Sequence, residues 1–110
     1  RSSGIFLTYY AMTEPIIPKR RIITEKGNLI EIVAWQVPKS EFYPEGVKYS
    51  FTFIHKDKRV IAFDNFNNEG HHKHHFDKKE PYKFKSLEET ADQFFILTKE
   101  FERTQGAEKL

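Results

Sequence analysis

Four short segments of the chain have patterns of hydrophobic, β-branched and polar residues that are typical of β-strands. Turn-forming residues separate the segments: Gly-Asn after the first, two prolines and a glycine after the second, and Lys-Asp-Lys after the third. We therefore expect an antiparallel meander in which each strand pairs with the next. The expected strands cover residues 20–24, 29–37, 47–55 and 59–65.

Two of these segments indicate how the sheet is buried. Segment 29–37 is largely apolar on both faces, with Leu29 and Val33 on one side and Ile30 and Ala34 on the other. A strand without a polar face is typical of the interior of a sheet. Segment 47–55 places its aromatic residues on one face, which predicts a hydrophobic surface that another element must cover.

That element is a helix near the C-terminus. After residues 81–84, which we expect to be extended, Ser86 begins a capping box and can accept a hydrogen bond from the backbone N–H of Glu89. Apolar residues then recur at helical spacing up to Phe101, and Gly106 suits the helix end. The fold class predicted is α+β: an antiparallel β-sheet of four to six strands with a C-terminal α-helix packed on one face.

Length and composition indicate one domain. The chain has 110 residues, and its eleven Phe, five Tyr and one Trp provide large side chains for a single core. We expect residues 12–105 to form this domain, starting at Met12. Residues 1–11 are expected to be a cloning remnant or an upstream extension, and residues 106–110 a C-terminal tail.

Composition also argues against cysteine-based sites and against a membrane-spanning segment. Without cysteine the chain can form neither disulfides nor thiolate sites, which suits a reducing cytosol. No apolar run approaches the roughly 18 residues that a membrane span needs. We expect a cytoplasmic protein with no membrane partner.

Charge is unevenly distributed, although the net charge is only +2. Residues 55–85 contain eight Lys or Arg against five Asp or Glu, whereas residues 86–110 contain three against six. The basic part is either ordinary solvated surface or a face that attracts phosphates. We expect Trp35 and Tyr49 to be core residues rather than platforms for stacking bases.

Histidines are concentrated in residues 63–76, which contain four of the five in the chain. They are His71, His72, His74 and His75. Imidazole exchanges protons near neutral pH and binds metal ions, so the cluster indicates that a polar group is handled here. Asp64 and Asn65 end the preceding apolar segment and are expected beside the imidazoles, although both residue types also commonly end strands.

In extended backbone, His72 and His74 share one face and Lys73 lies on the other. The residues alone leave three interpretations open. The two imidazoles can act as general acid and general base on a phosphate, with Lys73 or Arg59 offsetting charge. They can instead bind zinc or a similar ion, with Asp64 as an oxygen ligand. A histidine-rich polar loop can also be inert surface.

The order of motifs along the chain adds information. Five motifs precede the helix: Glu-Ile-Val-Ala-Trp-Gln-Val-Pro at 31–38, Val-Lys-Tyr-Ser-Phe at 47–51, Phe-Asp-Asn at 63–65, Gly-His-His-Lys-His at 70–74 and Glu-Pro-Tyr-Lys-Phe at 80–84. In this order the chain resembles the TumE family, toxin components of prokaryotic type II toxin–antitoxin systems. The likeness covers about residues 20–101.

The family pattern, carried over residue by residue, selects Asp64, Asn65, Gly70, His72, His74, Pro81, Tyr82 and Phe84. His71 stands where relatives often show an acidic residue, and His75 is an additional imidazole. The resemblance implies a soluble intracellular toxin, inactivated by a cognate antitoxin that usually carries a DNA-binding module. It also implies RNA as the substrate.

On this basis we expect an endoribonuclease that needs no cofactor. His72 and His74 form its acid–base pair, and Asp64 orients an imidazole or raises its pKa. The residues expected to bind substrate are Asn65, Lys73, Arg59 and Tyr82.

Two alternatives stay open. A metal-dependent nuclease would hold zinc or manganese at His72, His74 and Asp64. A non-catalytic module would bind nucleic acid or a protein partner through a basic, aromatic face. A homodimer formed through an exposed sheet edge is compatible with either.

Overall fold

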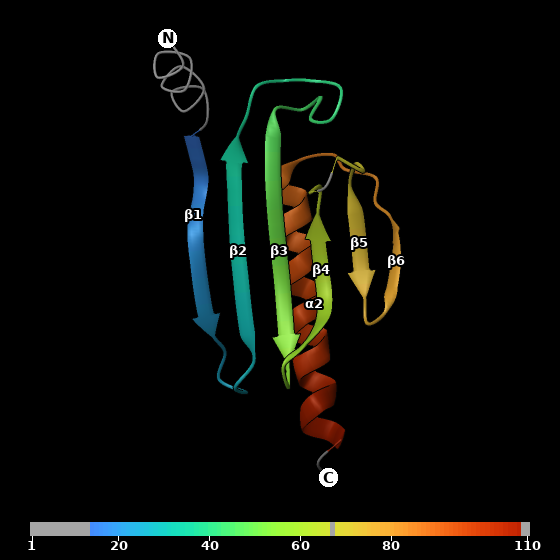
Figure 1. Ribbon diagram of the computed structural model, residues 1–110. Coiled ribbons are helices and arrows are strands. Elements are labelled where there is room, and N and C mark those ends of the chain that lie inside the picture. The colour runs from blue at the N-terminus through green and yellow to red at the C-terminus, as the bar shows by residue number, and fades with distance from the viewer. Residues whose placement is uncertain (1–13, 67, 109–110) are drawn as a thin grey trace.

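The computed structural model describes residues 14–66 and 68–108 and shows a six-stranded antiparallel sheet with a helix packed against it (Figure 1). The strands follow the order of the sequence. They are β1 (Glu14–Ile23), β2 (Leu29–Gln36), β3 (Val47–His55), β4 (Lys58–Asp64), β5 (His72–His75) and β6 (Lys78–Pro81), and the helix is α2 (Leu87–Glu108). The predicted α+β fold is confirmed. The predictions for residues 1–11 lie outside the described residues.

The predicted strands agree with β2, β3 and β4 to within one residue, but β1 begins six residues earlier than expected. Nearly all of its side chains are exposed, so its sequence has no alternation to reveal it. Its pairing with β2 is irregular near Pro15 and Pro18, which lack the N–H group of a regular ladder. Strand β6 was not among the expected strands. The residues that follow it, 82–86, have no regular secondary structure.

The helix begins as predicted and ends later. The backbone N–H of Glu89 donates to the hydroxyl of Ser86 at 3.0 Å, which is the expected cap. The helix continues past Gly106 to Glu108, so the end predicted at Gly106 is wrong. A glycine inside the last turn costs only about 1 kcal/mol relative to alanine, and this does not stop the helix. No helix in residues 14–66 and 68–108 is long and apolar enough to cross a bilayer.

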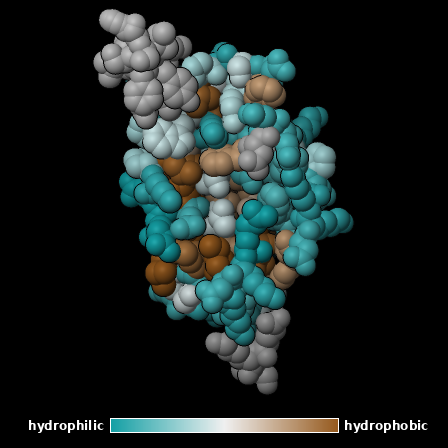
Figure 2. Space-filling model, viewed as in Figure 1, coloured by the Kyte–Doolittle hydropathy of each residue, from teal (hydrophilic) through white to brown (hydrophobic). Residues whose placement is uncertain are grey.

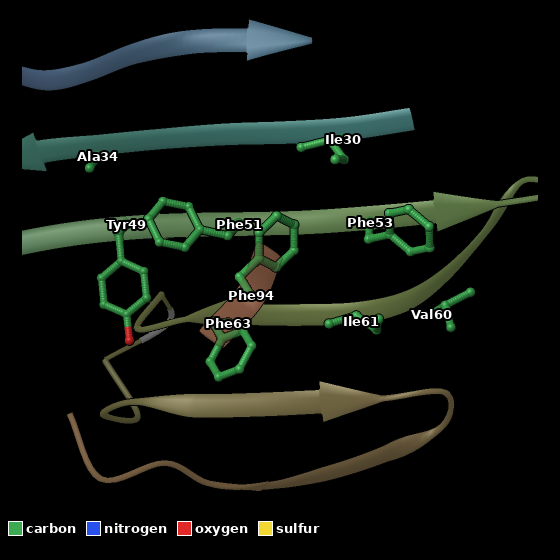
Figure 3. Packing of buried hydrophobic residues seen from close by; sticks show 9 residues of the cluster. All are labelled: Ile30, Ala34, Tyr49, Phe51, Phe53, Val60, Ile61, Phe63 and Phe94. Carbon is green, nitrogen blue, oxygen red and sulfur yellow. The ribbon is translucent and has the colours of Figure 1, made fainter. Parts of the chain in front are cut away.

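The core lies between α2 and the aromatic face of the sheet. The ring of Phe94 from the helix packs against Phe51 of β3 and Phe63 of β4, with centroids 5.8 and 6.4 Å apart (Figure 3). Tyr49 is fully buried in the same cluster, as predicted. Trp35 is only partly buried and lies outside that cluster, so its assignment to the core is wrong. It neighbours Ala34 in β2 and therefore faces the other side of the sheet.

A β-bulge in β4 determines which residues reach that other side. Phe53 pairs with Ile61 and Ile54 pairs with Arg59, which leaves Val60 as an extra residue on β4. Without the bulge, Arg59 would share the helix-covered face with Ile61. The extra residue instead turns Arg59 to the face that α2 leaves uncovered, which we call the open face.

Replacing Phe94 with Ala is expected to lower the free energy of unfolding by about 3–5 kcal/mol, because a buried ring is removed and a cavity remains. The matched control is Ile96→Ala at a position on the same helix that is 56% exposed, where a change within about 0.5 kcal/mol is expected. Urea denaturation followed by circular dichroism measures both. Equal losses in the two variants would contradict this packing.

Candidate active site

A pocket of about 350 Å³ opens on the open face over β3 to β6. We call it the histidine pocket. Its charged and imidazole lining residues are Arg59, Asp64, Glu69, His72, His74 and Lys79. Figure 2 looks onto this face: hydrophilic side chains predominate toward β5 and β6, whereas hydrophobic ones show between polar neighbours toward β1 and β2.

Strand register brings these residues together. Asp64 of β4 lies opposite His72 of β5, and His74 lies opposite Ala62 on one side and Lys79 of β6 on the other. His72 and His74 therefore share the open face, as alternation predicts. Their ring centroids are 6.5 Å apart.

Both ring nitrogens of His74 have partners. Nε2 lies 3.2 Å from Oδ2 of Asp64, and Nδ1 lies 3.3 Å from Nη2 of Arg59. Arginine can only donate, so Nδ1 must accept and carries no proton. The ring proton is then on Nε2, which donates to the Asp64 carboxylate. His74 is thus held as the neutral Nε2–H tautomer between a cation and an anion.

The electrostatics agree with this assignment. Burial lowers the pKa of His74 because it disfavours the charged ring, and the positive charge of Arg59 lowers it further. The Asp64 carboxylate acts in the opposite direction, but the net pKa is below the ordinary value. Near neutral pH the imidazole of His74 is therefore neutral, and its Nε2–H group donates a hydrogen bond to the Asp64 carboxylate.

His72 is in a different situation. It is partly exposed, and no protein partner engages its ring nitrogens within residues 14–66 and 68–108. It is the imidazole of the histidine pocket that can exchange a proton with a bound molecule directly.

Asn65 lies beside the pocket but is turned into the protein. It is 1% exposed; its Oδ1 accepts from the backbone N–H of Tyr49 at 3.0 Å, and its Nδ2 donates to the carbonyl of Val47 at 2.8 Å. The side chain thereby replaces strand hydrogen bonds just after β4 ends. This places the amide in structural contacts rather than toward the pocket.

Two further residues predicted to bind substrate lie on the opposite side of the sheet from the histidine pair. Lys73 pairs with Phe63, whose ring packs against the helix. The hydroxyl of Tyr82 hydrogen-bonds to Thr90 of α2 at 3.0 Å, and its ring meets Phe63 edge-on. Neither shares the histidine pocket with His72 and His74.

Lys79 was not among the predicted site residues, although it lines the histidine pocket. A two-residue turn after His75 places Lys79 opposite His74. The sequence does not reveal this register, because strand β6 has no hydrophobic alternation. Its ammonium group pairs with Glu69 at 2.5 Å and lowers the pKa of that exposed carboxyl.

The other two clustered histidines have separate environments. His71 stacks on Phe84 with centroids 4.3 Å apart, and its Nδ1 lies 2.9 Å from the hydroxyl of Tyr49. Burial raises the pKa of Tyr49, so the hydroxyl stays protonated and donates to Nδ1. Nε2 then donates to Glu45 at 3.1 Å. His71 therefore ties strand β3 to two loops, whereas His75 is exposed.

The donor set does not fit a metal ion in this arrangement. Within residues 14–66 and 68–108, no three His, Asp or Glu side chains converge as ligands would. The nitrogen of His74 that does not face Asp64 faces a guanidinium group instead.

The fold and this pocket define a small α+β protein with an imidazole pair, a carboxylate and an arginine on one sheet face. The family model described as Toxin TumE matches residues 4–102, and the chain belongs to this family. The predicted family is confirmed, and the match includes residues 4–11, which were set apart above. The family name indicates a toxin and thereby suggests an antitoxin partner. No curated protein and no solved structure matches the chain.

The pKa of His74 is expected to lie below the ordinary histidine value of 6.5, as measured by NMR titration of the ring protons. Arg59→Gln is expected to raise the pKa of His74, because a cation is removed, and Asp64→Asn to lower it. The unfolded chain binds more protons than the folded one between the folded pKa and 6.5, so acidification through this window favours unfolding. A pKa of His74 above 6.5 would contradict the assigned tautomer.

Proposed function

We propose that the protein is an endoribonuclease toxin that cleaves RNA at the histidine pocket and is inactivated by a cognate antitoxin. The observation that carries the proposal is the convergence of His72, His74, Asp64 and Arg59 on one polar pocket. The separation of the His72 and His74 rings suits a phosphate group that contacts both of them.

RNA is the phosphodiester that suits this chemistry. Its ribose carries a 2′-hydroxyl next to the phosphate, so the attacking group is already in position and needs only a base to remove its proton. The leaving 5′-oxygen then needs an acid. Two imidazoles can supply both functions near neutral pH.

The environments of the two rings divide these roles. His72, whose ring nitrogens have no partner among the described residues, accepts the proton of the 2′-hydroxyl. The 2′-oxygen attacks phosphorus, a 2′,3′-cyclic phosphate forms, and the bond to the 5′-oxygen breaks. His74 donates the proton that the leaving oxygen requires.

His74 becomes an acid when substrate arrives. A phosphate that binds Arg59 draws the guanidinium away from Nδ1 and offsets its charge. Both effects raise the pKa of His74, while Asp64 remains hydrogen-bonded to Nε2 and stabilises the imidazolium. Binding of substrate and protonation of the acid are thereby coupled. Lys79 provides a second cation for the phosphate once it exchanges its pairing with Glu69.

His72→Ala is expected to reduce cleavage of single-stranded RNA by about 10²- to 10⁴-fold, because a general base is lost. The matched control is His75→Ala, which changes an exposed imidazole on the same strand and the opposite face, and is expected to stay within about twofold of wild type. Gel analysis of end-labelled RNA in EDTA measures both variants. The 2′,3′-cyclic phosphate end of the product reports the mechanism.

Full activity of His72→Ala would overturn the assignment. Activity that EDTA abolishes and zinc or manganese restores would select the metal-dependent alternative.

A second candidate function is a module that binds nucleic acid without cleaving it. It is favoured by the engagement of both nitrogens of His74, since among the described residues this leaves His72 as the imidazole of the resting pocket without a protein partner. Growth inhibition that survives His72→Ala but is lost on replacing Arg59 and Lys79 with Gln would select it. Loss of inhibition in His72→Ala, with folding intact, supports the nuclease.

A further inference from the structure

A second, larger cleft of about 830 Å³ lies where the β3–β4 turn and the β5–β6 turn come together. Both turns are at the lower end of the sheet in Figure 1, away from the β2–β3 loop. The charged side chains that line it, other than histidine, are Lys56, Lys58, Arg59, Asp77 and Lys79. We call it the basic cleft, because four of these five are cations and attract phosphates.

The basic cleft adjoins the histidine pocket. Arg59, His74 and Lys79 line both. A strand bound with one phosphate beside His74 therefore reaches the basic cleft with its next nucleotide.

The basic cleft is also lined by an aromatic residue, Phe76, whose backbone conformation is unfavourable. Phe76 is 55% exposed and has a φ of 58°, in a two-residue turn between the paired His75 and Lys78. This region of φ suits glycine or asparagine, and a bulky residue there is strained. The N–H of Phe76 donates to the carbonyl of Val60 at 2.7 Å, which holds the turn in place. An exposed phenyl ring thus occupies a position where glycine or asparagine would cause less backbone strain.

A fixed imidazole also lines the cleft. The carboxylate of Glu102 can only accept, so the amide nitrogen of Asn28 faces it at 2.6 Å. The amide oxygen of Asn28 then faces Nδ1 of His55 at 2.7 Å, and Nδ1 must carry the proton. In the neutral ring Nε2 is left as an acceptor for an N–H or O–H group of a ligand.

We propose that the basic cleft binds one unpaired nucleotide of single-stranded RNA next to the phosphate that is cleaved. Its base stacks on Phe76, and Lys56 and Lys58 hold its outer phosphate, since aromatic stacking combined with cations is how single strands are bound without base pairing. His55 accepts a hydrogen bond from the base or sugar. This subsite rests on the proposed function, because the strand enters it from the histidine pocket.

Binding of a single-stranded oligonucleotide with 2′-fluoro riboses, which lacks the attacking hydroxyl, tests the subsite by fluorescence anisotropy. Phe76→Gly is expected to weaken binding about 5- to 150-fold, the effect of losing one stacked base. Its melting temperature is not expected to fall, because glycine adopts the positive φ without strain. Phe76→Tyr keeps the ring and is expected to bind within about twofold of wild type.

Two further variants sharpen the test. Lys58→Gln is expected to reduce the slope of log Kd against log salt by about 0.7, the contribution of one phosphate contact to a single strand. Phe42→Ala removes a phenyl ring that is 46% exposed in the loop at the far end of the sheet, and is expected to leave the affinity unchanged.

The outcomes separate this inference from the proposed function. RNA cleavage by the wild type with unchanged affinity in Phe76→Gly overturns the subsite alone. Weakened binding in Phe76→Gly without any cleavage by the wild type supports the subsite and overturns the nuclease. No binding of the oligonucleotide by the wild type overturns the subsite as well.

Discussion

One extra residue in strand β4 determines which charged side chain lies beside the histidine pair. The bulge at Val60 rotates Arg59 onto the open face, where its guanidinium meets His74. The carbonyl of Val60 also receives the N–H of Phe76, which positions the next turn along the sheet. A regular strand would bury a cation against the helix and leave the histidine pair without its nearest positive charge.

The four clustered histidines have the same chemistry but four different environments. His71 is locked between a buried hydroxyl and a carboxylate, and His74 is locked between a guanidinium and a carboxylate. His72 lies in the histidine pocket with no partner for its ring nitrogens in the part of the chain that the structure describes, and His75 is exposed on the other face. Function in such a cluster is decided by the partners of each ring, not by the number of imidazoles.

The sequence predicted those structural features that depend on hydrophobic alternation or on local helix capping. Strand β3, the start of α2 at Ser86 and the shared face of His72 and His74 all follow from such patterns. Strand β1 is exposed on both faces and β6 is short and charged, so neither leaves a pattern. The bulge lies within an apolar run, where one additional apolar residue is indistinguishable from its neighbours. The inward turn of Asn65 depends on strand ends that are distant in sequence.

The two faces of the sheet separate the residues that stabilise the fold from the residues that line the histidine pocket. One face carries Phe51 and Phe63 against the helix, while the other carries the histidine pocket. Because successive residues of a strand point to opposite faces, substitutions in the pocket need not disturb the aromatic packing behind it. In evolutionary terms, a lineage can vary the side chains that line the histidine pocket while its folding stability is maintained by residues one position away.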